Sequence, residues 1–515
     1  MVTNAQQKSS SSASGLTTRA ALLTAAKVLG FALTVPLPLL LVRVLTQSDF
    51  GLYKQVFQIL QDSLSLLGLH VAASAYYFFP RHPDKKPQVA LNVLIFYSVV
   101  GAAAALVFAV YPQWVTLIFK SGELVPYIPL LGVAILLWLL SSLLEVVTVA
   151  NSEVKVAVVF TVVVQLSKSA LLIAAGAFFH SVHAIVLAAT IQGALQCVLL
   201  FLYLRSRFGR FWQSFDRALF KTQLSNAIPF GLGALAYVMQ ATLHNYFVSH
   251  YFDPSAFAIY TVGCFELPLL GLMLEAVISV LLPEIARREG EGDYQGILTL
   301  WASAVRKLAF FFIPAYALAF VLRRELITFL FTSQYEAAVP IFAVNLLAIF
   351  LFISIPTSII RAFDDLKFFR LKLSVAMIPL LFGLLYVSIH AFGLVGAIAA
   401  FIVGQTVDLG IIMWKILRRL NAGRGDIRRL APLLRISVAA ALGSLAAYLT
   451  RLLMLDSPSL AILIVSGAAF GVVHLTVAFL IGCVTSDEKD QLRSALARFQ
   501  RFGAALLGAA ATGAR

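Results

Sequence analysis

The chain has 515 residues, of which 60% are hydrophobic and only 12% charged, and its formal net charge is +15. A soluble protein carries about 25% charged residues, so this composition excludes a soluble protein and predicts an all-α polytopic integral membrane protein. Its excess positive charge therefore has to be located along the chain before it can indicate any partner, and it does not by itself predict nucleic-acid binding.

The first apolar stretch, residues 20–45, is long enough to cross a bilayer, which takes about 20 residues. It nevertheless contains Lys27, which shares one helical face with two threonines, and it contains Pro36 and Pro38. Prolines remove backbone donors and interrupt a helix. This stretch is therefore predicted to be a broken membrane helix that lines a cavity rather than facing lipid.

Further apolar stretches follow at short intervals, and together with the first they predict about fourteen membrane helices. They lie near 54–79, 88–111, 126–149, 156–179, 182–204, 223–249, 257–282, 302–322, 337–360, 370–390, 393–415, 433–453 and 460–482. The segment FGLY at 50–53 returns as FAIY at 257–260, 207 positions later (257 minus 50). Because the two copies begin equivalent spans, we expect two halves of six spans each, followed by two further spans.

The predicted organisation has six parts. They are a disordered cytoplasmic N-terminus (1–18), an N-lobe (19–206), an amphipathic cytoplasmic linker (207–222), a C-lobe (223–416), the extra helices (433–482) and an amphipathic cytoplasmic tail (485–515). Lys and Arg gather in alternate gaps between spans, which is the bias of cytoplasmic loops. The chain is thus expected to be a multi-pass protein with both termini in the cytoplasm, and most of its positive charge meets anionic lipid.

Charged groups within the predicted spans of the first half are functional candidates, because a charge in hydrocarbon costs about 2.5–3.5 kcal/mol on insertion scales. Asp62 continues a polar helical face, Glu145 lies on the fourth span near Trp138, and Lys168 lies on the fifth. Estimated depths suggest that Lys27 pairs or shares a site with Glu145, and Lys168 with Asp62. The alternative is that such pairs only neutralise charge and hold helices together.

The second half offers acids with no evident basic partner at the same depth. Glu266 and Glu275 lie on the eighth span and Asp408 lies on the twelfth. Such groups can bind H⁺ or Na⁺ during transport, so they are candidates for ion coupling. An equally good interpretation is a protonated carboxyl group at a contact between helices.

Several kinds of site are absent from the sequence. It contains no phosphate-binding loop of the G-x-x-x-x-G-K-[ST] type, and Cys197, Cys264 and Cys483 have a spacing that suits neither zinc nor a disulfide framework. No external gap is long enough for a catalytic domain. We therefore expect no metal, no cofactor and no enzymatic activity.

Three short segments carry a resemblance to a known family. The stretch K-V-L-G-F-x-L followed by L-V-R-V-L-T-Q-S-D-F-G-L-Y (27–53), the segment V-L-L-P-E-I-A-R-R-E-G-E-G-D (280–293), and Ser333-Gln334-Tyr335 before Val339-Pro340 resemble bacterial polysaccharide and lipopolysaccharide export flippases. These flippases belong to the multidrug/oligosaccharidyl-lipid/polysaccharide exporter superfamily. The resemblance implies two six-helix lobes around a central cavity that opens alternately to each side of the bacterial inner membrane, with two extra C-terminal helices that some members add.

The resemblance also implies a polyprenyl-pyrophosphate-linked oligosaccharide as substrate, membrane lipids as surroundings, and a polysaccharide polymerase and other assembly proteins as partners, without nucleic acid. A pyrophosphate needs cations, which Lys27 and Lys168 would supply in the cavity and Arg43 and Lys54 at its outer rim. Trp138 could stack on a sugar. Two alternatives stay open, an ion-coupled multidrug antiporter that depends on the acids of the second half, and a non-transporting scaffold of an envelope-synthesis complex.

Overall fold

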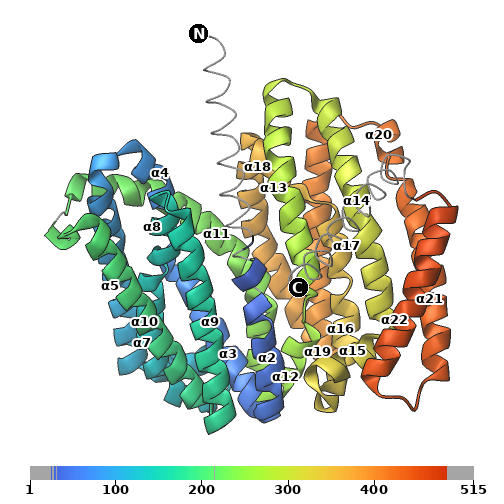
Figure 1. Cartoon of the computed structure of the whole chain (residues 1–515), viewed down its shortest axis with the longest axis horizontal. Coiled ribbons are helices and arrows are strands. Elements are labelled where there is room, and N and C mark those ends of the chain that lie inside the picture. Colours follow the sequence, from blue (N-terminus) through green and yellow to red (C-terminus); the bar gives the residue numbers. More distant parts are fainter. Residues whose placement is uncertain (1–24, 26–27, 31, 214, 484–515) are drawn as a thin grey trace, which may run out of the picture. The chain divides into compact units, whose positions relative to one another are not determined.

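The computed structural model describes residues 25, 28–30, 32–213 and 215–483. These residues are helical almost throughout and include no β-strand (Figure 1), which confirms the predicted all-α class. The predicted N-terminal segment 1–18 and tail 485–515 lie outside the described residues, as does Lys27. As the two prolines predict, the first span is interrupted by a turn at Val35, directly before α2 begins at Pro36.

The helices follow one another with short connections. Up to residue 213 they are α2 (Pro36–Val44), α3 (Gln47–Gly68), α4 (Ser74–Arg81), η1 (Pro83–Lys85), α5 (Lys86–Val110), η2 (Pro112–Trp114), α6 (Val115–Ile118), η3 (Gly122–Tyr127), α7 (Ile128–Ser141), α8 (Leu143–Ala150), α9 (Val154–Phe179), α10 (Val182–Phe208) and η4 (Phe211–Gln213). From residue 217 they are α11 (Arg217–Tyr251), α12 (Pro254–Gly263), α13 (Pro268–Gly290), α14 (Tyr294–Val321), α15 (Arg323–Phe331), η5 (Ser333–Ala338), α16 (Val339–Asn345), α17 (Ala348–Ile353), α18 (Pro356–Ala362), α19 (Asp364–Arg419), α20 (Arg424–Arg428), α21 (Pro432–Leu453) and α22 (Ser459–Leu480).

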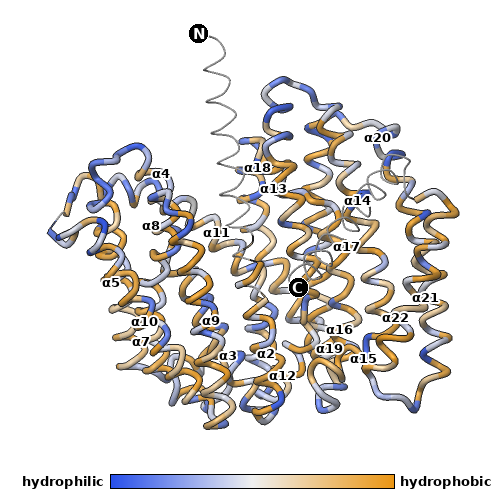
Figure 2. Tube along the Cα trace, viewed as in Figure 1, coloured by the Kyte–Doolittle hydropathy of each residue, from blue (hydrophilic) through white to orange (hydrophobic). Residues whose placement is uncertain are grey.

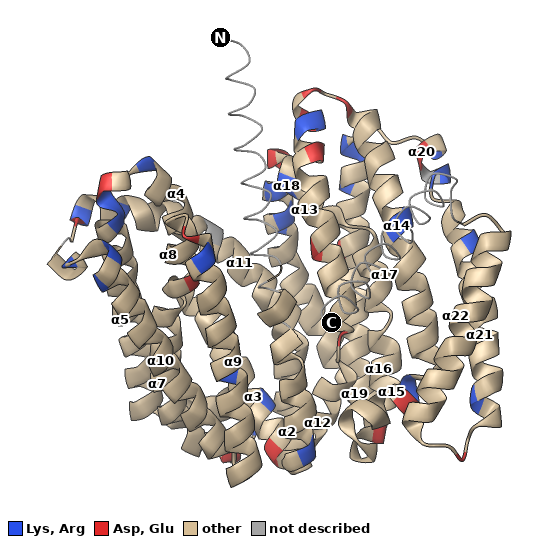
Figure 3. Cartoon of the chain, viewed as in Figure 1, with Lys and Arg blue, Asp and Glu red and all other residues tan. Residues whose placement is uncertain are grey.

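Ten helical segments among the described residues are long and apolar enough to cross a membrane. One of them, α19, contains two of the predicted spans, joined at Gly393 with φ 58° and ψ −137°, a conformation that favours glycine. Hydrophobic residues run along the helices and hydrophilic residues gather near their ends (Figure 2), where most Lys, Arg, Asp and Glu also lie (Figure 3). The polytopic membrane architecture is thereby confirmed.

Besides the first span, whose break the prolines predict, four predicted spans are broken into shorter helices, and periodicity does not reveal these four breaks. The second span is α3 and α4, the fourth is α7 and α8, the eighth is α12 and α13, and the tenth is η5 with α16, α17 and α18. Counted from the start of each six-span half, the broken spans are the second and the fourth in both halves. This correspondence supports the internal repeat.

The repeated FGLY and FAIY segments pack directly against each other. A Cβ atom on Gly51 would lie 1.8 Å from the carbonyl oxygen of Pro254, so only glycine permits the close approach of α3 to α12. The two helices begin in the same way, because the side chains of Thr46 and Asp253 each accept a hydrogen bond from the backbone N–H three residues on. These two caps are also 207 residues apart (253 minus 46).

The described residues form two compact units. One comprises 25–272, 327–345 and 363–413, and the other comprises 273–326, 346–362 and 414–483. In the second unit, α21 and α22 pack together and α21 packs on α14. Arg451 on α21 donates from Nε to the Glu325 carboxylate at 2.7 Å, and His474 on α22 is buried between Phe470 and Phe310. The predicted lobe boundaries at 206 and 223 remain predictions.

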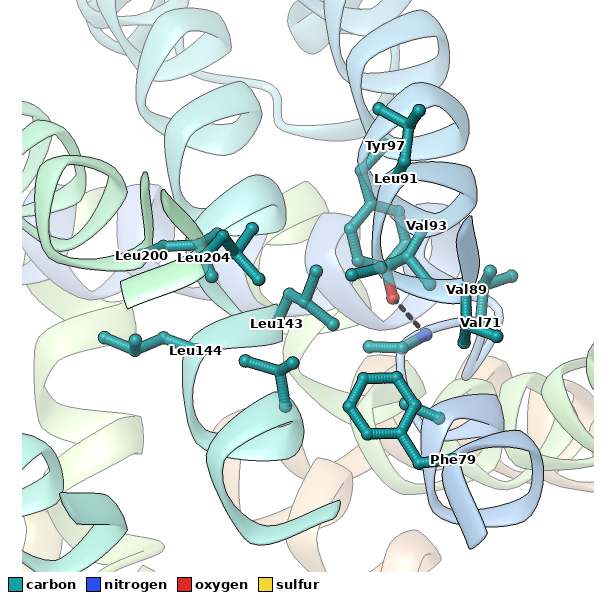
Figure 4. Packing of buried hydrophobic residues seen from close by; sticks show 14 of the residues in the cluster. Val71, Phe79, Val89, Leu91, Val93, Tyr97, Leu143, Leu144, Leu200 and Leu204 are labelled. Carbon is teal, nitrogen blue, oxygen red and sulfur yellow. Dashed lines mark hydrogen bonds between the residues drawn. The ribbon is translucent and has the colours of Figure 1, made fainter. Parts of the chain in front are cut away.

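One end of the first unit is densely packed (Figure 4). Apolar residues from α4, α5, α8 and α10 form a buried cluster that includes Phe79, Val93 and Leu143. The Tyr97 hydroxyl accepts from the Ala72 amide at 2.9 Å and donates to the Gly68 carbonyl at 3.3 Å. The short break between α3 and α4 is thus held by a side chain of α5, which fixes where the polar face of α3 ends.

Candidate functional site

The polar face of α3 is the first part of the candidate site. Gln55, Gln58 and Asp62 follow at intervals of three and four residues, so they share one helical face. Gln55 is fully buried and neither atom of its amide group has a hydrogen-bond partner, and the buried amide nitrogen of Gln58 has none either. Buried polar groups in proteins are nearly always paired, so this face has capacity to bind water or a polar ligand.

Lys54 lies on the same helix, which begins at Gln47 rather than near residue 54 as predicted. Its ammonium nitrogen is 5.4 Å from the centre of the Phe50 ring and 6.0 Å from that of Tyr53. Aromatic faces attract a cation without neutralising it. Among the described residues no carboxylate forms an ion pair with Lys54, so its positive charge remains available to an anion.

Lys168 on α9 is held in a similar way. Its Nζ atom lies 4.9 Å from the centre of the Trp138 ring, and Trp138 donates from Nε1 to the carbonyl of Ala189 at 2.7 Å. Trp138 is 8% exposed, so it positions the lysine and offers little surface for a sugar to stack on. The described residues include no ion pair between Lys168 and Asp62.

Asp62 instead accepts a hydrogen bond from the Tyr246 hydroxyl of α11 at 2.7 Å. Gln58 and Thr242 lie close enough to act on the same carboxylate, and all three of these neighbours are neutral. Sequence reasoning missed Tyr246, although it follows the polar residues His244 and Asn245 on the seventh predicted span. Only the crossing of two helices 184 residues apart in sequence reveals the contact.

Glu145 lies in the first turn of α8, just after the break that separates α8 from α7. The negative charge of its carboxylate interacts electrostatically with the Tyr76 hydroxyl of α4. Tyr76 and Tyr77 are both about half exposed. The predicted partner Lys27 lies outside the described residues, so the pair remains a prediction.

Arg43 contacts backbone carbonyl groups. Its guanidinium donates to the carbonyls of Phe329 at 2.8 Å and Leu330 at 2.9 Å, at the C-terminal end of α15. Cations are favourable there because the carbonyl dipoles of a helix point outward at that end. Gln47 donates to the nearby Gln334 carbonyl at 3.3 Å. Arg43 thus links the end of α2 to α15, and its role as a substrate ligand remains a prediction.

The acids of the second half occupy three different environments. Asp408 is buried and forms an ion pair with Arg370, also on α19. Glu266 lies exposed in the break between α12 and α13, and Glu275 is exposed on α13. Sequence reasoning did not foresee the pairing of Asp408 with Arg370. Ion coupling by any of the three remains a prediction.

Clusters of His, Cys, Asp and Glu that could hold a metal ion are absent from the part of the chain that the structure describes. Cys197, Cys264 and Cys483 are free thiols, each buried or partly buried. The arrangement therefore offers cations, neutral amides and hydroxyls, which can bind a polar or anionic ligand.

Comparison with known proteins gives a family and a fold. A family model described as "Polysaccharide biosynthesis protein" matches residues 40–340. No curated protein sequence matches the chain. Several solved transporter structures have the same fold. The lipid II flippase MurJ in an inward closed conformation aligns with a TM-score of 0.69 and 15% identity over 89% of this chain and 98% of its own.

Two further solved structures extend the likeness. A multidrug resistance transporter of the MATE family and MOP superfamily, in an inward-facing conformation, gives a TM-score of 0.60 and 17% identity, covering 78% of this chain and 95% of that one. A MOP superfamily transporter from Pyrococcus furiosus gives 0.53 and 15%, covering 78% and 96%. At these identities the likeness is one of fold, which is that of the MOP superfamily transporters.

Proposed function

The chain belongs to the polysaccharide biosynthesis protein family, and from this premise we propose that it is a flippase for polyprenyl-pyrophosphate-linked oligosaccharides. It moves the head group from the cytoplasmic to the outer leaflet of a bacterial inner membrane, by alternating access, for assembly of a cell-surface polysaccharide such as O-antigen, capsule or exopolysaccharide. It is a transporter and catalyses no covalent chemistry. The polyprenyl chain remains in lipid while the head group crosses.

One observation carries the proposal, namely a partly buried lysine held by an aromatic ring. The Lys168 ammonium lies over Trp138 at 4.9 Å, and none of the described carboxylates pairs with it. A lysine paired with a carboxylate would present no net charge, whereas a lysine held by an indole ring has no neutralising partner and can pair with an anion. A pyrophosphate is the part of the proposed substrate that such a charge stabilises.

The remaining groups support the same substrate. Lys54 adds a second cation held over aromatic rings, and Lys27 adds a third in the proposed site. The unpartnered amide group of Gln55 can donate to or accept from sugar hydroxyls, and the unpartnered amide nitrogen of Gln58 can donate to them. Glu145 and Asp62 would orient the head group through hydrogen bonds. Arg43 remains a rim residue in this proposal.

The experiment uses purified protein in proteoliposomes with a labelled polyprenyl-pyrophosphate oligosaccharide in one leaflet. An impermeant enzyme that cleaves the oligosaccharide reports how much label crosses. We expect movement with the wild type and little with Lys168→Ala or Lys27→Ala, while Lys120→Ala, an exposed lysine outside the proposed site, serves as the control. Movement equal to that in protein-free liposomes would contradict the proposal.

A further inference from the structure

Two long helices differ in polarity from the other membrane-spanning helices. Among the described helices of 18 residues or more, α3 and α11 are the two that fall short of the apolar composition shared by the ten candidate spans. They pack against each other, and the direct hydrogen bond between their side chains joins Asp62 to Tyr246. Part of the polarity of both helices therefore lies where they meet.

The contact joins the first six predicted spans to the seventh. Next to the Asp62 carboxylate lie the Tyr246 hydroxyl, the Thr242 hydroxyl and the Gln58 amide. The Phe119 ring lies 5.6 Å from that of Tyr246. The site thus has a carboxylate, a neutral hydrogen-bond donor in Tyr246 and an aromatic ring beside that donor.

Charged and titratable groups on the neighbouring elements are engaged elsewhere. On α11, the buried His244 contacts the Tyr260 hydroxyl through Nδ1 at 2.7 Å, and His250 contacts the Ile118 carbonyl through Nδ1 at 2.9 Å. On α3, Lys54 is eight residues earlier, about 12 Å along the helix axis, and lies over Phe50 and Tyr53. Lys168 lies over Trp138 of α7, and α7 itself has no charged residue. No cation among the described residues therefore pairs with Asp62.

We propose that Asp62 is a proton-binding site, and that its protonation releases α3 from α11. A proton taken from water adds to a carboxylate oxygen of Asp62, and the charged Asp62 becomes a neutral carboxylic acid. The Tyr246 O–H···O⁻ bond then becomes a bond between two neutral groups, which is roughly half as strong. Loss of the proton restores the charge-assisted bond and joins the helices again.

This inference rests on the proposed function in one respect, namely that binding of a proton at Asp62 would be coupled to the opening of a transporter. It moves the proton site from the acids of the second half to the first half. Asp408 is unsuited to the same role because Arg370 already neutralises it. Asp62 has no such partner, so a proton is the cation it can gain without displacing a side chain.

Infrared spectroscopy of the full-length protein in liposomes tests the proton site directly. The C=O stretch of a protonated carboxyl group is followed while the pH is varied, for the wild type, Asp62→Asn and Asp408→Asn. We expect a pH-dependent band that Asp62→Asn removes and Asp408→Asn retains, and that shifts in frequency in Tyr246→Phe. A wild-type spectrum that Asp62→Asn leaves unchanged at every pH would overturn the proposal.

A distance measurement tests the release of α3 from α11. Spin labels are placed at Ser65 and Met239, exposed positions on the two helices, in a background in which the three native cysteines are replaced. We expect the distance to change with pH in the wild type and to be independent of pH in Asp62→Asn, with pH dependence retained in Asp62→Glu. A pH dependence that persists in Asp62→Asn would overturn the proposal.

Neither measurement uses a lipid-linked substrate. If the protein failed to move oligosaccharides, the proton site would still be tested independently. Conversely, Asp62→Asn could remove the infrared band while oligosaccharides still move. That result would support the proton site and show that transport does not draw its energy from it.

Discussion

Asp62 and Asp408 are carboxylates in two regions of the same compact unit, and their partners differ in kind. Asp408 forms a buried ion pair with Arg370 on its own helix, α19. Asp62 is joined to Tyr246 on another helix and has only neutral neighbours among the described residues. Both residues are acids within predicted spans, and the sequence does not reveal the partner of either.

The difference teaches that the partner decides the role of a buried charge. A carboxylate that is paired with a buried cation cannot be protonated or removed without loss of stability, because its partner is left as an unpaired buried charge. A carboxylate whose neighbours are neutral has no cation to neutralise it, so it can gain and lose a proton. The same distinction separates the paired Gln223 from the unpaired Gln55, and the lysines over aromatic rings from the arginines in ion pairs.

Breaking the Asp408 pair gives the largest expected effect. Arg370→Ala leaves a buried carboxylate without its cation, which costs about 3–5 kcal/mol. We expect a marked fall in the thermal unfolding temperature of the protein in detergent, and most of it should be recovered in Arg370→Ala/Asp408→Leu. An Arg370→Ala variant as stable as the wild type would contradict the claim that the Asp408–Arg370 pair has a structural role.

Removing a lysine that has no anionic partner should change transport rather than stability. Lys168→Ala loses a charged hydrogen bond to the proposed pyrophosphate, worth about 1.5–3 kcal/mol, or roughly 10- to 100-fold in the rate of movement at low substrate. Lys168→Arg should retain part of the rate, because it keeps the charge. A Lys168→Ala variant with normal transport and reduced stability would assign the lysine to packing instead.

Two buried glutamines extend the comparison to neutral groups. Gln223 donates to the Ser74 hydroxyl at 2.7 Å and accepts from Asn92 at 3.4 Å, so Gln223→Leu should lower the free energy of unfolding by about 1–3 kcal/mol. Gln55 has no partner in the structure, so Gln55→Leu should leave stability unchanged or raise it, while slowing transport. Chemical unfolding of the two variants side by side measures the difference.

The smallest effect is expected at the surface, at the start of α11. Asp216 accepts from the Leu219 amide at 2.9 Å and from Lys85 at 3.0 Å, and these bonds hold the pKa of its carboxyl group below the usual value. A lowered pKa stabilises the folded state above the unfolded pKa of about 3.9, and this stability is lost as the pH falls through the folded value. Asp216→Asn should therefore lose stability at neutral pH and show a weaker dependence on acid pH.

Much of the fold follows from the sequence because apolar length alone specifies a membrane helix. The stretches near 88–111 and 156–179, for example, differ by two residues or fewer at either end from α5 and α9. The breaks in the second, fourth, eighth and tenth spans do not follow, because the polar groups at those breaks are satisfied by distant residues. Leu69 has a left-handed backbone conformation at one break. Its carbonyl group lies so close to Gly231 of α11 that a Cβ atom there would be 2.5 Å from the oxygen.

The candidate site is only half predictable for the same reason. Sequence identifies Lys54, Asp62 and Lys168 as polar groups in apolar segments, because that pattern is local. It does not identify Tyr246 as the partner of Asp62 or the Trp138 ring as the partner of Lys168, since each contact depends on how two helices pack. Depth along the chain suggested Asp62 for Lys168, whereas the structure gives each of them a neutral or aromatic partner.

One competition measurement tests the central claim that this chain moves an anionic lipid-linked head group. Proteoliposomes containing the wild type would receive a labelled polyprenyl-pyrophosphate oligosaccharide, with either an unlabelled copy of it or an organic cation as competitor. We predict that the unlabelled lipid slows movement of the label and that the cation has no effect. Proton-driven efflux of the organic cation, with no movement of the lipid-linked oligosaccharide, would contradict the account and identify a multidrug antiporter.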